Sequence, residues 1–254
     1  MNKYLKNLKR IEFVITSSCT GKCRHCSQGE HTSCDKLDKN IAADALRKIS
    51  KEYNISSVMT FGGEPLLFPE TVFEIHKAAT EMNISHRQLI TNGYFSNDKS
   101  EIKSVAKMLS ESGVNDILLS VDAFHQETIP LEHVKVFAEY LLKYKLPVRV
   151  HPAWLVSRTD DNPYNNKTWQ LLRDFSETGI KISDGNVIFP SGNAIKYFSE
   201  YFDLTKTYDN PYREDPTDLK AISFCANGDI LDGNIYKQDI IDILSSYAPE
   251  NSKP

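Results

Sequence analysis

From residue 11 to residue 190, short apolar runs rich in β-branched residues alternate with longer segments whose apolar residues recur at helical spacing. This alternation predicts strands and helices in turn. The predicted strands span residues 11–16, 57–61, 87–91, 116–121, 147–151 and a sixth within 180–189. The predicted helices span residues 41–53, 70–82, 98–111, 131–144 and 167–178, and glycines at 113 and 179 are expected to end two of them.

Repeated strand–helix units form parallel sheets, which either close toward a barrel or wind into an open sheet. In both cases functional residues gather at the carboxyl ends of the strands. After residue 190 the alternation ends. A loop over 202–218, a small hairpin made by 221–225 and 230–231 around a turn at 227–229, a helix over 236–247 and a frayed tail from Ala248 are expected there.

Composition and charge exclude several classes of protein. The 254 residues carry a formal charge of −4, which argues against a broadly basic nucleic-acid binder. No apolar run is long enough for a transmembrane helix, and the polar, basic start of the chain lacks a secretory apolar region. We therefore expect a cytoplasmic protein without a nucleic-acid or membrane partner.

Four of the five cysteines, Cys19, Cys23, Cys26 and Cys34, lie close together near the N-terminus, and the fifth is Cys225. An odd, clustered set without a signal peptide is not a disulfide framework. The C-x3-C-x2-C spacing places three thiolates on one short loop, which suits three irons of a [4Fe–4S] cluster. Zinc is the alternative, with a fourth ligand from His25, His31 or Cys34.

The second motif is Gly62-Gly63-Glu64-Pro65, directly after the second predicted strand. Together with the cysteine motif after the first strand, it resembles the radical S-adenosyl-L-methionine (SAM) superfamily. The resemblance implies a partial (β/α)6 TIM-like barrel over residues 1–192 and a C-terminal extension over 193–254. It also implies a [4Fe–4S] cluster bound by Cys19, Cys23 and Cys26, SAM on the fourth iron, and an external one-electron donor of the flavodoxin or ferredoxin type.

The resemblance further suggests how SAM is bound. Gly62 and Gly63 lack a Cβ and let the backbone approach the methionyl group, while Glu64 accepts from its amino group. His25 stands where the family carries an aromatic side chain near adenine, unless it faces solvent. Pleat alternation is expected to turn four polar side chains toward the barrel lumen, those of Ser120, Asp122, Arg149 and His151. The remaining residues assigned to cofactor binding are Pro65, Asn92, Ser120, Asp122, Arg149, His151 and Ile188. A turn role for Asn92 and a structural ion pair for Arg149 are the alternatives.

Residues 224–235 resemble a shortened SPASM or twitch extension. Such extensions hold auxiliary clusters through many cysteines, but here only Cys34 and Cys225 remain, so one cluster per chain is expected. Cys225 is either a small core residue or the catalytic hydrogen-atom donor to a substrate radical. The substrate is accordingly a peptide, modified for example by epimerisation, or a small metabolite. A non-catalytic iron–sulfur protein is the third alternative.

Overall fold

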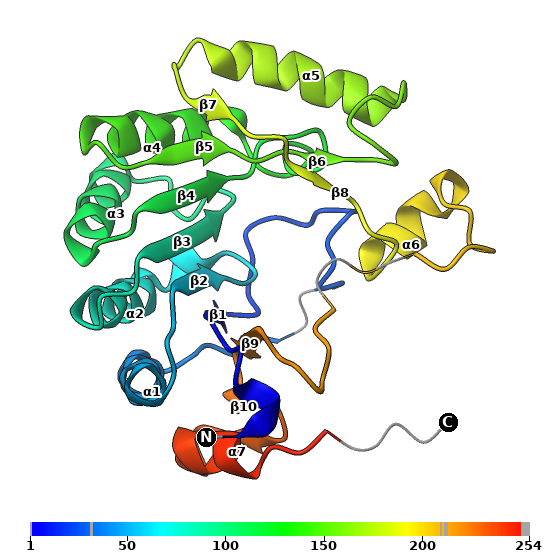
Figure 1. The fold of residues 1–254 in the computed structure, drawn as a ribbon. Coiled ribbons are helices and arrows are strands. Elements are labelled where there is room, and N and C mark those ends of the chain that lie inside the picture. Colours follow the sequence, from blue (N-terminus) through cyan, green and yellow to red (C-terminus); the bar gives the residue numbers. More distant parts are fainter. Residues whose placement is uncertain (1, 31–32, 209, 211–212, 250–254) are drawn as a thin grey trace.

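The computed structural model describes residues 2–30, 33–208, 210 and 213–249. His31, one of the candidate zinc ligands, lies outside these residues. The main sheet has the strand order β7-β5-β4-β3-β2-β1-β9, and all of its neighbouring strands are parallel. Figure 1 shows the helices α1–α4 following one another along its outer face, so the expected partial barrel is confirmed.

The elements agree closely with the expected pattern in the first two thirds of the chain. The strands are β1 (Arg10–Val14), β2 (Ser57–Phe61), β3 (His86–Thr91), β4 (Asp116–Leu119), β5 (Val148–Val150), β6 (Ala153–Trp154), β7 (Lys181–Ile182), β8 (Asn186–Val187), β9 (Ala221–Phe224), β10 (Asp229–Ile230) and β11 (Gly233–Asn234). The α-helices are α1 (Lys39–Glu52), α2 (Pro69–Glu81), α3 (Lys99–Ser112), α4 (Leu131–Lys143), α5 (Pro163–Ser176), α6 (Asn193–Phe198) and α7 (Ile240–Ser246). Short 3-10 helices are η1 (Lys3–Leu5), η2 (Pro65–Leu67) and η3 (Ser199–Tyr201).

Capping residues explain where the helices begin and end. Asp38 and Asp98 precede α1 and α3, and each carboxylate accepts from backbone N–H groups of the first turn. Gly113 ends α3 at φ 88°, a left-handed conformation that favours glycine. Apolar side chains of these helices pack on the alternating buried residues of the strands, such as Ile117 and Leu119 of β4, and form one large core.

The sixth predicted strand is divided into two. β7 pairs with β5 in the main sheet, whereas β8 pairs with β6 in a separate two-stranded sheet. The break falls at Gly185, where a Cβ would stand 2.1 Å from the carbonyl oxygen of Pro152. Figure 1 shows β6 and β8 continuing beyond β5 and β7.

The predicted hairpin of residues 221–225 with 230–231 is wrong. β9 instead pairs in parallel with β1 at the edge of the main sheet, and the antiparallel hairpin is formed by β10 and β11. Phe224 explains the difference, because its ring stacks on Phe13 of β1 with centroids 4.7 Å apart. The buried face of β9 therefore belongs to the main core.

The C-terminal segment is joined to the core at several places. Asn2, beside η1, donates from its side chain to the carbonyl oxygens of Leu244 and Tyr247 at the end of α7 (Figure 1). The proposed division after residue 192 separates segments that pack together, and it stays a prediction. Among the described residues, no helix is long and apolar enough to cross a membrane.

Candidate active site

The cysteine loop after β1 and the glycine segment after β2 continue the pairing of their strands. The N–H of Gly63 donates to the carbonyl oxygen of Thr16, and the N–H of Glu64 donates to that of Ser18, both over 2.8 Å. These hydrogen bonds hold the two motifs side by side, and the second one ends on Ser18, the residue before Cys19. The parallel pairing of β1 with β2 therefore brings the two motifs together.

The two glycines make this close approach possible. A Cβ on Gly63 would stand 2.0 Å from the carbonyl oxygen of Ser18, and one on Gly62 would stand 2.7 Å from that of Thr16. Gly62 also has φ 150°. The absence of a Cβ is therefore required by the neighbouring loop of the protein itself. The sequence did not predict this contact, and the approach of the two glycines to SAM stays a prediction.

The Glu64 carboxylate is fully buried and is occupied by protein donors. It accepts from the Thr91 hydroxyl over 2.7 Å, from the Asn92 N–H over 2.9 Å and from the Leu66 N–H over 2.9 Å. Burial raises the pKa of Glu64 to about 7, and these hydrogen bonds oppose that shift. Glu64 therefore joins the loops after β2 and β3, a role that the sequence did not suggest.

Asn92 connects this network to the cysteine loop. Its side-chain amide lies 3.2 Å from the Thr20 hydroxyl and 3.6 Å from the Cys19 sulfur. Asn92 also forms the expected turn, since its carbonyl oxygen Oδ1 accepts from the Tyr94 N–H. The turn interpretation of Asn92 is confirmed, and its assignment to SAM binding stays a prediction.

The three motif cysteines lie in one partly enclosed loop. Cys23 is buried and Cys19 and Cys26 are half-buried. Burial raises the pKa of all three thiols, to about 11 for Cys19, and the charge of Cys26 raises the pKa values of the other two further. The three thiols therefore lie in a poorly hydrated part of the loop. Thiolates are the usual protein ligands of iron–sulfur clusters, so this donor set fits such a group.

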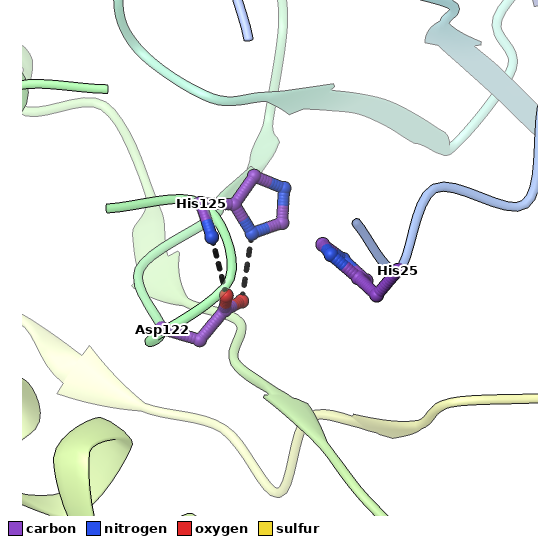
Figure 2. Close-up of side chains that lie close together, drawn as sticks. All are labelled: His25, Asp122 and His125. Carbon is purple, nitrogen blue, oxygen red and sulfur yellow. Dashed lines mark hydrogen bonds and ion pairs between the residues drawn. The ribbon is translucent and has the colours of Figure 1, made fainter. Parts of the chain in front are cut away.

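His25 points from the cysteine loop toward a second group of polar side chains. Figure 2 shows it facing His125 and Asp122, which follow β4. The His25 and His125 rings meet edge to face with centroids 4.8 Å apart, and the candidate ligand atoms of the three residues lie within 4.8 Å of one another.

This group is not a metal site, because the Asp122 oxygens are already used. Oδ1 accepts from the backbone N–H groups of Phe124 and His125, and Oδ2 accepts from His125 Nδ1 and the N–H of Ala153. Burial alone would raise the pKa of Asp122, but the neighbouring His125 holds it well below its usual range. Asp122 is a buried anion that orders the loop after β4.

Two buried polar atoms beside this group have no partner among the described residues, His25 Nδ1 and Gln126 Nε2. Burial lowers the pKa of His25 to about 4, so its ring is neutral. Unpaired buried polar atoms are costly unless a ligand completes them. An adenosyl group, which carries several hydrogen-bonding nitrogens and hydroxyls, fits such a place.

The remaining predicted residues divide into two groups. Most lie at the carboxyl ends of the strands: Pro65 opens η2, Ser120 is buried after β4, His151 bonds Ser183 over 2.8 Å, and Ile188 is buried beside Phe124 and Phe198. Arg149 does not join them.

The guanidinium of Arg149 binds Asp116, the first residue of β4, at 2.8 and 3.1 Å. Burial alone would raise the pKa of Asp116, but Arg149 and His86 lower it. The side chain is therefore directed to the amino ends of the strands, where residues serve stability. The assignment of Arg149 to SAM is corrected to the structural ion pair.

The resemblance places Asn193 in residues 188–194, a segment that contacts adenine in many members of the superfamily, and it gives Asn193 no contact with the cysteine loop. In the structure, the side chain and the backbone N–H of Asn193 both donate to carbonyl oxygens of the cysteine loop. The adenine contact of this segment stays a prediction.

Comparison with known proteins identifies the class of this fold and site. The Radical SAM superfamily model matches residues 13–195, and the chain belongs to that superfamily. Its enzymes use a [4Fe–4S] cluster and SAM, and they require a reductant.

The curated relatives include GTP 3',8-cyclase of Lactiplantibacillus plantarum, 26% identical over 117 residues, which are 45% of this chain and 33% of the relative. A probable GTP 3',8-cyclase of Methanococcus aeolicus is 27% identical over 126 residues, 48% of this chain and 40% of the relative. The chain therefore matches less than half the length of these relatives.

Solved structures resemble almost the whole chain. Streptococcus suis SuiB bound to S-adenosylmethionine has a TM-score of 0.62 at 15% identity, over 94% of this chain and 66% of SuiB. SuiB bound to the precursor peptide SuiA has a TM-score of 0.61 at 14% identity, and the match covers 97% of this chain and 69% of SuiB. Native anSMEcpe with bound AdoMet has a TM-score of 0.59 at 15% identity, and the match covers 93% of this chain and 80% of anSMEcpe. At these identities the likeness concerns the fold.

Proposed function

We propose that this radical SAM enzyme abstracts a hydrogen atom from a peptide, with Cys19, Cys23 and Cys26 as the ligands of its cluster. Held by these three cysteines, a [4Fe–4S] cluster would supply the electron for reductive cleavage of SAM, and a flavodoxin- or ferredoxin-type donor would supply that electron to the cluster. The observation that carries the assignment is the joining of the cysteine loop to the Gly63–Glu64 segment by two backbone hydrogen bonds.

The chain's own residues would bind and orient SAM. The backbone of the Gly62–Pro65 segment and Asn92 lie beside Cys19 and form the methionyl end of the proposed site. His25 Nδ1 and Gln126 Nε2 offer unpaired polar atoms for the adenosyl end. Ser120, His151 and Ile188 border the same ends of the strands and complete the proposed lining. Asp122 holds the loop that carries His125 and Gln126, and thereby acts through its neighbours.

A peptide substrate is supported by the extent of the structural likeness. The resemblance to SuiB bound to its precursor peptide covers 97% of this chain and so includes the segment after α6. A small metabolite is the second candidate, because the curated relatives include GTP 3',8-cyclases. Those matches cover only about half of this chain, which makes them the weaker support.

Cys225 supports the peptide assignment from the chain itself. Ile222 and Phe224 of β9 are buried in the main core, so Ser223 between them faces the other side of the sheet, and Cys225 follows directly after β9. Ser223 donates there to Glu12 of β1 over 2.8 Å, and Cys225 is exposed. The interpretation as a buried core residue is therefore wrong. An accessible thiol suits a donor that returns hydrogen to a substrate radical.

The two substrate classes can be separated directly. Peptides encoded by short reading frames beside the gene are synthesised and compared with GTP as stimulators of 5′-deoxyadenosine formation by the loaded, dithionite-reduced enzyme with SAM. We expect one of the peptides to increase the rate at least several-fold and GTP to leave it unchanged. Stimulation by GTP, without stimulation by any peptide, would favour the small-metabolite enzyme.

A further inference from the structure

The helix α6 returns from the far side of the barrel to the cysteine loop, as Figure 1 shows. The backbone N–H of Asn193, the first residue of α6, donates to the carbonyl oxygen of Cys26 over 3.0 Å. Its side-chain amide donates to the carbonyl oxygens of Cys23 and Gly29, each over 3.3 Å. One residue thus bonds the backbones of two of the three proposed cluster ligands.

The carbonyl oxygens of Cys23 and Cys26 each accept one hydrogen bond within the loop, and Asn193 donates a second one. Within the loop, the carbonyl oxygen of Cys23 accepts from the Cys26 N–H, and that of Cys26 accepts from the Gly29 N–H, both over 3.2 Å. A carbonyl oxygen has two lone pairs, so one remains on each. Asn193 donates the second hydrogen bond to each of these two carbonyl oxygens. The described loop has no helix or strand between Cys19 and Gly29, so such contacts fix its conformation.

The residue before Asn193 allows the close approach. Gly192 has φ 53°, and a Cβ there would stand 2.6 Å from the carbonyl oxygens of both Cys26 and Ser27. Any side chain at this position would push α6 and the cysteine loop apart.

The apolar side of α6 is anchored in another part of the protein, because Ala194 and Phe198 are buried in a small apolar cluster with Phe124 and Ile188. Two further contacts join α6 to the cysteine loop itself: the Arg24 guanidinium lies 5.4 Å from the ring centroid of Phe198, and Lys196 pairs with Glu30 at 2.7 Å. The helix is therefore a fixed support against which Asn193 can hold the loop.

We propose that Asn193 is a positioning residue for the iron–sulfur cluster, which it serves by fixing the backbone that carries Cys23 and Cys26. This inference rests on the proposed ligand assignment of the three cysteines. Preorganisation of a ligand loop favours the loaded state, because less conformational entropy is lost when the group binds. Binding linkage requires the converse, so the loaded cluster stabilises the docking of α6.

The test compares Asn193→Asp and Asn193→Ala with the wild-type protein. The aspartate keeps the shape of the side chain but replaces its donor by an acceptor, which faces two carbonyl oxygens. Asn166→Asp is the matched control, because Asn166 is also an asparagine near the start of a helix and is bonded only at the surface, to Asp161. After anaerobic reconstitution, loss of iron to ferrozine is followed by absorbance.

We expect both Asn193 variants to lose iron about tenfold faster than the wild type, as two lost hydrogen bonds imply. The electron paramagnetic resonance spectrum of the reduced cluster should also change, whereas Asn166→Asp should match the wild type in both measurements. Equal rates of iron loss overturn the proposal. Faster loss with an unchanged spectrum also overturns it, because that result describes a general loss of stability.

Hydrogen exchange of the backbone amides of residues 193–198 provides a second readout. In the wild type they should exchange more slowly in the loaded than in the metal-free protein, and this difference should shrink in Asn193→Asp. Exchange that is independent of loading contradicts the proposal. A triple alanine variant of the three cysteines, measured in parallel for iron content, tests the ligand assignment separately.

Discussion

The Glu64 carboxylate accepts a hydrogen bond from the backbone N–H of Asn92 over 2.9 Å, which joins the loops that follow β2 and β3. The same carboxylate binds the Thr91 hydroxyl, and Asn92 in turn reaches the Cys19 sulfur. A buried acid thus links the glycine segment to the cysteine loop through side chains from three neighbouring strand ends. Its hydrogen bonds act in a water-excluded region, where an unpaired donor is expensive.

Replacement of Glu64 should therefore reduce stability before any cofactor is bound. In Glu64→Gln an amide NH2 group replaces one carboxylate oxygen, so at least one of the three donors faces another donor, and the free energy of unfolding of the metal-free protein should fall by about 1–3 kcal/mol. Urea denaturation measures this change. Glu70→Gln is the control, because Glu70 is an exposed carboxylate at the start of α2, and its replacement should change stability by less than about 0.5 kcal/mol. Equal stability of the two variants would contradict this structural role of Glu64.

The contact between Gly63 and Ser18 leads to a second prediction. In Gly63→Ala the new Cβ would lie 2.0 Å from a backbone oxygen, so the cysteine loop must move. The variant should retain less than half of the wild-type iron after reconstitution and desalting. Gly179→Ala is a demanding control, since Gly179 has φ 77° but no atom within 4 Å of the added Cβ. If both variants keep their iron equally well, the close packing of the two loops is unimportant for loading.

His76 on α2 should make stability depend on pH. The side chain is fully buried, its Nε2 lies 2.9 Å from the Thr60 hydroxyl, and burial lowers its pKa to about 3 from an ordinary value of 6.5. Between these values the unfolded chain binds a proton that the folded protein excludes, so stability falls as the pH decreases below 6.5. The contribution at pH 5.5 is about 1.4 kcal/mol.

Urea denaturation at pH 7.5 and pH 5.5 tests this dependence. His76→Leu should lose about 1.4 kcal/mol less than the wild type between the two values. The comparison is made within each variant, so a general change in stability does not affect it. An equal pH dependence in both proteins would show that His76 is protonated in the folded state.

Once a substrate is known, Cys225→Ala tests the proposed hydrogen donor. The variant should still form 5′-deoxyadenosine, because Cys225 is neither a proposed cluster ligand nor a proposed SAM-binding residue, but it should not return hydrogen to the substrate. In deuterated buffer the wild-type product should contain deuterium, since thiol hydrogens exchange with solvent. A product without deuterium, or unchanged product formation by Cys225→Ala, would remove Cys225 from the reaction.

The sequence predicts the local elements of this fold better than their partners. Strand β2 has the predicted bounds, and α1–α4 begin and end within two residues of the predicted helices, because periodicity and capping residues are local signals. The pairing of β9 with β1 was missed because these residues are far apart in sequence, and the contacts that join them, such as the packing of Phe224 on Phe13, are long-range. The split of the sixth strand depends on Gly185 meeting Pro152, which is also a long-range contact.

The candidate site shows the same division. Motif spacing and the strand-end rule located the cysteine loop, the glycine segment and the loop after β4. Alternation correctly placed Arg149 on the concave face, but it does not tell toward which end of the strand a long side chain extends, and Asp116 decides that. The contacts of Asn193 with the cysteine loop were missed because its partners there are the backbone carbonyls of Cys23 and Cys26, and backbone carbonyl groups have no sequence signature.

Cleavage of SAM by the reconstituted protein tests the central claim most directly. The wild-type protein should bind about four irons and four sulfides per chain, absorb near roughly 400 nm, and form 5′-deoxyadenosine with dithionite and SAM. The variant in which Cys19, Cys23 and Cys26 are all alanine should lack both the absorbance and the product. Stoichiometric zinc without visible absorbance in the native protein, or 5′-deoxyadenosine formation equal to that of the triple variant, would contradict the account.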